Sequence, residues 1–136
     1  MATKSFRAVH RYARIAPRKA RLVADLVRGL QVDEAMALLE NHPRRAAHLL
    51  RKVLKSAMDN ASQDVEVNLK GLMVTDARVD MGPLLGFRPR WRPRAMGRAT
   101  PIRKRTSHLI ISVTEEESRR QRRREAQPAE APEAGE

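Results

Sequence analysis

The stretch "FRPRWRPRAMGRA", from Phe87 to Ala99, holds five arginines, two prolines and one tryptophan, and it has no acidic residue. It lies within a longer run, from Met81 to Thr114, that contains no Asp or Glu in 34 residues. The quoted stretch lacks the apolar residues that would let it fold against its own chain, and nothing inside the longer run neutralises its cations, so their charge must be matched by a partner outside the run. Eight cations share this environment: Arg88, Arg90, Arg92, Arg94, Arg98, Arg103, Lys104 and Arg105.

The sequence on either side of this stretch is typical of β-strands. Val and Leu recur over residues 65–81, and "HLIISV" follows at 108–113. Two strands flanking a basic segment predict a long β-hairpin over about 72–113, with its tip at about 83–101. The tip is expected to be irregular, because proline cannot donate a hydrogen bond inside a sheet. Four prolines fall in it: Pro83, Pro89, Pro93 and Pro101.

The arginines at the start of the tip alternate with other residues. An extended conformation would place Arg88, Arg90, Arg92 and Arg94 on one side, spaced by roughly 6.6 Å, which suits a row of phosphates. Arginine can grip a phosphate with two hydrogen bonds. Arginine also supplies 22 of the 28 basic residues in the whole chain, so its use here is not specific to the tip. Trp91 can either stack on a base or pack beneath the prolines of the tip.

The N-terminal half predicts one strand and three helices. Residues 5–15 alternate as in a strand, and helices are expected over 17–28, from a cap at Asp33 to the residue before Pro43, and over about 43–62. The sequence therefore predicts an α+β fold in which three helices pack on a small antiparallel three-stranded sheet, with a long protruding β-hairpin.

Two of the predicted helices carry cations opposite their apolar sides. The first has a mostly cationic stripe, which is a candidate contact surface: Arg18, Arg21, Asp25 and Arg28. On the third, a solvated face and a nucleic-acid contact are equally compatible with the pattern: Arg44, Arg45, Arg51, Lys52 and Lys55.

Charge is spread unevenly over the 136 residues. Residues 1–114 hold 23 Lys and Arg against 9 Asp and Glu, a net charge of +14, and they are expected to form one domain. Residues 115–136 hold 5 against 7, a net charge of −2, and their low complexity predicts a disordered tail. A field of this size favours a polyanionic partner, with nucleic acid first and an anionic membrane second.

Several classes of protein are excluded or disfavoured. Without cysteine the chain has no disulfide framework and no thiolate metal site. The absence of a secretory apolar region and of a membrane-spanning run predicts a soluble, cytoplasmic protein. No nucleophile is paired with a base and no phosphate-binding glycine loop occurs, so an enzyme is not expected. The histidines lack the spacing of a zinc site. Asp76 and Asp80 are better explained by pairing with Arg78 or with arginines of the hairpin than by magnesium. No catalytic residue, cofactor or metal is therefore predicted.

A winged helix-turn-helix protein that binds DNA is the main alternative, because three helices followed by a hairpin fit that outline. The second helix, "DEAMALLENH" at residues 33–42, has three acids and no Lys or Arg, and a wing of about 40 residues is too long. A cationic peptide on a membrane surface is disfavoured, because the arginines of the tip lack a helical moment.

Three stretches give the chain a family resemblance: "RIAPRKARLVADLVRG" at 14–29, "KVLKSAMDNA" at 52–61 and "PRAMGRATPIRKRTSHLIISV" at 93–113. Over roughly residues 5–114 the chain resembles ribosomal protein twenty-two of the large subunit. The resemblance implies a small α+β domain near the mouth of the polypeptide exit tunnel, with a long hairpin that reaches into ribosomal RNA and helps line the tunnel. It also implies support of subunit assembly, neighbouring ribosomal proteins and the nascent polypeptide as partners, and neither a membrane nor a homo-oligomer.

The residues that match the family motifs are expected to contact large-subunit RNA: Arg14, Arg18, Lys19, Arg21, Arg94, Arg98, Arg103, Lys104, Arg105 and His108. Arg11 and four residues of the tip complete the expected set: Arg88, Arg90, Trp91 and Arg92. The chain departs from the family mainly at the tip, where the link after Gly82-Pro83 is longer than usual. It also has Ala16 where a serine is common, which removes a helix cap worth about 1 kcal/mol, and Asp59 where alanine is usual.

Overall fold

The computed structural model of the chain describes residues 4–65 and 67–115. Its elements, in chain order, are β1 (Ser5–Ala13), α1 (Pro17–Val27), α2 (Val32–Asn41), α3 (Arg45–Ser62), the short 3₁₀ turn η1 (Leu69–Gly71), β2 (Leu72–Leu84), β3 (Arg90–Pro93), the turn η2 (Ala95–Gly97), β4 (Ala99–Ile102) and β5 (Arg105–Glu115). They confirm the predicted α+β fold with three helices. Of the predicted tail, residues 116–136 lie outside the described part of the chain, and Glu115 ends β5.

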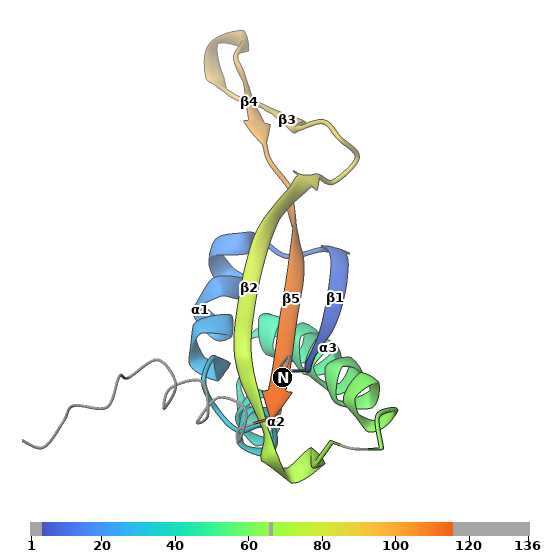
Figure 1. The fold of residues 1–136 in the computed structure, drawn as a ribbon. Helices are drawn as coiled ribbons and strands as arrows, with labels where there is room; N and C mark the ends of the chain where they lie inside the picture. The colour runs from blue at the N-terminus through green and yellow to red at the C-terminus, as the bar shows by residue number, and fades with distance from the viewer. Residues whose placement is uncertain (1–3, 66, 116–136) are drawn as a thin grey trace, which may run out of the picture.

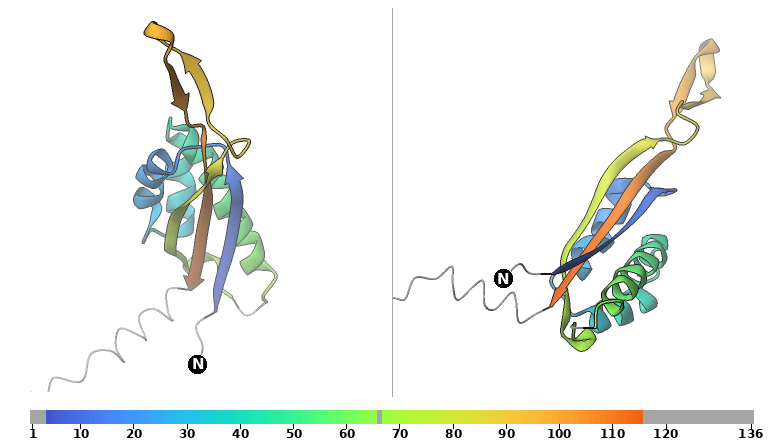
Figure 2. Two further views of the ribbon diagram at one scale, coloured as in Figure 1. Left: turned by 90° about the horizontal axis from the view of Figure 1, so that it is seen from above. Right: turned by 45° about the vertical axis from the view of Figure 1, so that its right-hand side comes forward.

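The body of the molecule is an antiparallel three-stranded sheet in the order β1-β5-β2. Cross-strand pairs place Ile111 of the central strand between Ala8 of β1 and Ala77 of β2, and all three side chains are buried. The three helices pack on this face of the sheet, and the opposite face is open (Figures 1 and 2). From Leu109 to Val113, the residues of β5 on the helix side are all apolar and buried, which suits a central strand.

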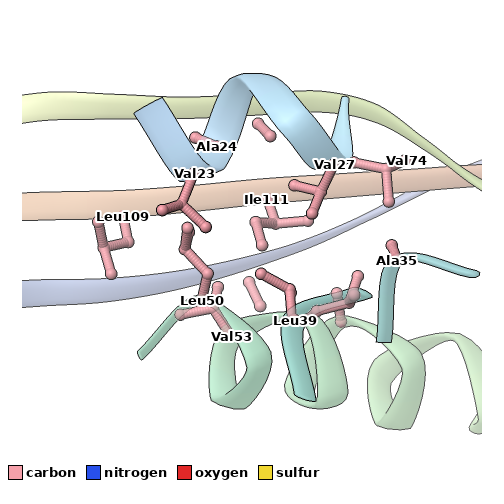
Figure 3. Close-up of a cluster of buried hydrophobic side chains, with 14 of the residues drawn as sticks. Val23, Ala24, Val27, Ala35, Leu39, Leu50, Val53, Val74, Leu109 and Ile111 are labelled. Carbon is pink, nitrogen blue, oxygen red and sulfur yellow. The ribbon is translucent and has the colours of Figure 1, made fainter. Parts of the chain in front are cut away.

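The core lies between the sheet and the helices, as Figure 3 shows. Val23 and Val27 of α1 are one helical turn apart and both are fully buried, and they face Ile111 from one side. Leu50 of α3 and Leu39 of α2 fill the space from the other side. The core is therefore aliphatic throughout, as expected for a chain with 3% aromatic residues.

Beyond the last pair of the body, Leu84 with Arg105, the chain forms the arm, which we define as residues 85–104. The arm contains a separate two-stranded ribbon of β3 and β4, joined by η2. It projects away from the body (Figures 1 and 2), and every arm residue except the half-buried Pro89 is exposed. This confirms the protruding hairpin.

The prediction that prolines would keep the tip irregular was wrong for β3 and β4, whereas residues 85–89 and 94–98 lie outside the strands. Pro93 lies in β3, where it pairs with Ala99, and Pro101 lies in β4, where it pairs with Trp91. Pro83 lies near the end of β2, within the register shift between Met81 and Leu84. In a ribbon of two strands each strand has a free edge, so a proline can sit there without removing a hydrogen bond from a neighbour.

Other boundaries differ from the predicted ones. The N-cap of α2 is Gln31, not Asp33, which lies in the first turn with Glu34 and favours the helix through its charge. The strand predicted from residue 65 begins at Leu72, because the side chain of Asn68 accepts a hydrogen bond from the amide of Lys70 (3.1 Å) and stabilises the turn η1. β5 is longer than predicted and already begins at Arg105.

Candidate nucleic-acid interface

The arm presents cations that the protein does not neutralise. It carries six arginines and Lys104, and no ion pair between described residues reaches any of them. Arg94 is the one held most closely, since its Nε donates to the hydroxyl of Thr100 (3.3 Å) and its amide donates to the carbonyl of Arg98 (2.7 Å). The arm is thus a positively charged surface without an internal counter-charge.

The predicted row of four arginines is only partly formed. Arg90 and Arg92 alternate within β3, and Arg94 follows in an extended conformation. Arg88 lies in the bend before the strand, next to Phe87, whose φ is +60°. The row therefore has three members, and Arg88 lies outside it.

Large apolar side chains are exposed among these cations. Trp91 lies opposite Pro101 in the ribbon and has 64% of its surface exposed, which leaves surface free for a partner. Phe87 is 86% exposed and Met96 is 93% exposed. Exposed apolar groups at the end of a projecting arm indicate that another molecule covers them.

A basic pocket of about 290 Å³ lies at the base of the arm. It brings together predicted residues from two distant segments, Arg14 on one side and Arg103, Lys104 and Arg105 on the other, and no acidic side chain lines it. Arg45, at the start of α3, completes the set of cations, and its sequence pattern was equally compatible with a solvated face and with a nucleic-acid contact. Its signal in the sequence is the pair Arg44-Arg45 at a helix start, where acidic residues are favoured.

The first turn of α1 continues this surface. Arg18 and Lys19 are exposed there, and Lys19 lines a second cavity of about 360 Å³ with Leu22, Arg44 and Arg45. Neither α1 nor α3 has an acidic residue in its first turn or a side-chain cap. Positive side chains beside the positive N-terminal ends of these helices repel them and lower the stability of the free protein. A bound anion would offset this repulsion.

The cationic stripe of α1 is not a single contact surface. The guanidinium group of Arg21 donates to the carbonyl of Val79 (3.2 Å), and that of Arg28 donates to the carbonyl of Ala77 (2.6 Å). Arg28 also pairs with Asp25 (3.1 Å). Both arginines thus contact the outer edge of β2, and only Arg18 of the stripe's cations has no such contact among the described residues.

Arg11 and His108 lie on neighbouring strands of the sheet. The Nδ1 atom of His108 accepts a hydrogen bond from the amide of Tyr12 (3.0 Å), and the Arg11 guanidinium carbon lies 5.7 Å from the centre of the Tyr12 ring. Tyr12 therefore joins two expected contacts, and sequence analysis missed it because a lone tyrosine in a strand gives no signal.

Other chemistries find little support in the described part of the chain. No helix there is long and apolar enough to cross a membrane, and no group of three His, Asp or Glu side chains could hold a metal ion. Asp76 pairs with Arg78 (3.4 Å), as predicted.

A comparison with protein families gives a match that covers both the body and the arm. Residues 8–114 match the family model described as ribosomal protein L22p/L17e. The matched range includes all the expected contacts and the basic pocket. The family match excludes the alternative that the chain is a winged helix-turn-helix protein.

Proposed function

Because the chain belongs to the ribosomal protein L22p/L17e family, which consists of structural, RNA-binding proteins of the large ribosomal subunit, we propose that its arm enters folded ribosomal RNA and helps line the polypeptide exit tunnel. The body would sit near the tunnel mouth, beside neighbouring ribosomal proteins. The protein would support assembly of the subunit as a single copy, and its tip would meet the nascent polypeptide.

One observation carries this proposal. The arm is exposed along almost its whole length, contains no acid, and has no ion pair within the described residues. Such a segment repels itself, and a surrounding polyanion is what stabilises it. An RNA enclosure supplies negative charge on all sides, which a flat surface would not.

Binding would proceed through release of counterions. Each arginine that neutralises a phosphate frees condensed cations from the RNA, and this entropy favours the complex. The basic pocket would hold the RNA backbone at the base of the arm through Arg14, Arg45 and Arg105. Once the base of the arm is held in this way, Arg90, Arg92 and Arg94 would contact the RNA along β3. Arg98, Arg103 and Lys104 would contact it along the segment that runs back to the body.

The body would supply further contacts. Arg11, Arg18, Lys19 and His108 are accessible for RNA beside the base of the arm. Arg21 can contribute only with the donors that its bond to Val79 leaves free. Arg88, Trp91 and the exposed Met96 lie where RNA or a nascent chain would reach them.

Site-specific photocrosslinking in translating ribosomes tests this placement. A photoreactive residue at Met96 should crosslink to large-subunit RNA and, during translation, to the nascent chain, because this side chain is 93% exposed at the end of the arm. The matched control is the same residue at Lys70, which is also exposed but lies in η1 at the other end of the molecule (Figure 1).

The position at Lys70 should give no adduct with the nascent chain. If the Met96 position crosslinks only to proteins outside the tunnel, or gives the same adducts as Lys70, then the arm does not line the tunnel.

A further inference from the structure

Tyr12 lies in a β-bulge of β1, between His10 and Ala13. The strand pairs with β5 residue by residue from Ser5 to His10, and then the register shifts so that Ala13 lies opposite Ser107. Tyr12 within this bulge has φ +56°, in the left-handed region. A bulky residue is rarely found there and costs about 1–3 kcal/mol, and bulges often redirect a side chain toward a functional site.

Two neighbours hold Tyr12 in place. Its amide donates to the Nδ1 atom of His108 (3.0 Å), and the two rings meet edge to face with their centres 4.9 Å apart. Because Nδ1 accepts this bond, the neutral imidazole carries its proton on Nε2. The guanidinium group of Arg11 lies 5.7 Å from the tyrosine ring. We name these three side chains the Tyr12 platform.

The platform is open to a ligand. Tyr12 remains 53% exposed, and its hydroxyl has no hydrogen-bond partner within residues 4–65 and 67–115. The platform lies at the end of β1, which reaches the base of the arm in Figure 1, and Arg14 of the basic pocket follows two residues later. An RNA held in that pocket would therefore pass beside the platform.

Although Arg11 is a cation, one neighbouring carboxylate makes the platform less suited to a phosphate than to a base. Asp80 of β2 lies opposite His108 in the sheet, so a carboxylate borders the platform. A phosphate would be repelled by this group, whereas the face of a base carries no net charge. Aromatic rings stack on bases regardless of sequence, and arginine adds a cation–π contribution.

We propose that Tyr12 is an RNA-binding residue that stacks on an unpaired base of large-subunit ribosomal RNA. Arg11 flanks the stacked base, and His108 is a positioning residue that acts through the amide of Tyr12. This inference rests on the proposed function, since it requires RNA at the base of the arm. Stacking of the Tyr12 ring on a base adds a contact that does not depend on charge.

Two substitutions separate stacking from structure. Tyr12→Phe keeps the ring, and Tyr12→Asn removes it while placing at φ +56° a residue that tolerates this conformation. The full chain is titrated against full-length large-subunit ribosomal RNA at constant salt. The Phe variant should bind within about twofold of the parent, and the Asn variant should bind roughly 5- to 150-fold more weakly, the loss expected for one stacked base.

Two further readouts identify the cause of the loss. Because no charge is removed, the dependence of affinity on salt should keep its slope in both variants. Chemical probing of the RNA should reveal a base that is protected by the parent and by the Phe variant but reactive with the Asn variant. Tyr12→Gly, which relieves the backbone strain, should reproduce the Asn result with unfolding no earlier than that of the parent.

The outcomes are distinct. If the parent shows no salt-dependent affinity for the RNA, the proposed function fails. If the parent binds but the Asn and Gly variants bind equally well, or if the Phe variant loses as much affinity as they do, the stacking role of Tyr12 is overturned.

Discussion

At the scale of single residues, identical side chains on one helix have different tasks. Arg18, Arg21 and Arg28 share a stripe of α1, yet Arg28 donates to the carbonyl of Ala77 at 2.6 Å whereas Arg18 is exposed without a partner among the described residues. An unpaired edge strand is prone to association with other strands. Arg21 and Arg28 donate hydrogen bonds to two carbonyls on the edge of β2, so their main role is to stabilise the fold.

This difference predicts that two alanine substitutions have different effects on stability. Arg28→Ala should lower the free energy of unfolding by about 1–2 kcal/mol, because it leaves a backbone carbonyl without its charged donor, although about half of the side chain is exposed. Arg18→Ala is the matched control and should change stability by less than about 0.5 kcal/mol. Urea unfolding of the full chain measures both.

The RNA affinity of the same variants completes the comparison. Arg18→Ala should weaken binding to large-subunit ribosomal RNA, and Arg28→Ala should change it little. Equal stability of the two variants would show that Arg28 is not a structural clamp. The sequence predicted the stripe but not this division, because which cations meet a carbonyl depends on where β2 packs against the helix.

At the scale of elements, the arm is joined to the body where β2 and β5 are in close contact. The hydroxyl of Thr106 donates to the carbonyl of Pro83 (2.5 Å), and it would lie 2.5 Å from a Cβ atom at position 82. Gly82 is therefore required for space and not for a turn. From the sequence, Gly82 permits either a turn or a close approach of the backbone. Only the packed strands show which of the two applies, because close approach of two strands is a tertiary property.

Gly82→Ala should destabilise this junction by about 1–3 kcal/mol, since the added methyl group also meets two backbone atoms of Thr106 at 3.2 Å. The matched control is Gly71→Ala, where the new Cβ atom would make only an ordinary contact at 3.8 Å. Chemical denaturation of both variants, together with NMR spectra of the arm, checks the expectation.

A second substitution tests the cause. Thr106→Ala in the Gly82→Ala background should recover only part of the lost stability, because the backbone contacts of position 106 remain. If Gly82→Ala unfolds at the same denaturant concentration as Gly71→Ala, the junction is looser than its geometry indicates.

At the scale of the whole molecule, hydrophobic periodicity and charge were enough to predict the architecture. The helical spacing of Leu50 and Val53 and the alternation in "HLIISV" place their side chains in one core, so helices and sheet followed from pattern. The acid-free run predicted an arm completed by a polyanion. The basic pocket and the Tyr12 bulge could not be predicted, because both arise where segments nearly a hundred residues apart meet: Arg14 with Arg103, and Tyr12 with His108.

Binding through counterion release predicts how salt acts on the complex. If five to eight cations meet phosphates, the logarithm of the binding constant should fall with the logarithm of salt concentration at a slope of roughly −3 to −7. Replacing Arg90, Arg92 and Arg94 together by serine should make the slope shallower by about 2 to 3. Thermal unfolding of the free protein should stay nearly unchanged, because these side chains are exposed on the arm and pair with no acid among the described residues.

The triple substitution to lysine is the control, because it keeps the three charges and removes only the planar guanidinium groups. This variant should retain the slope of the parent and lose affinity by a factor that does not depend on salt. A slope near zero for the parent would contradict docking by counterion release. Early unfolding of the serine variant would instead show that the arginines of β3 stabilise the free arm, and the arm would then have a structure that does not need RNA to complete it.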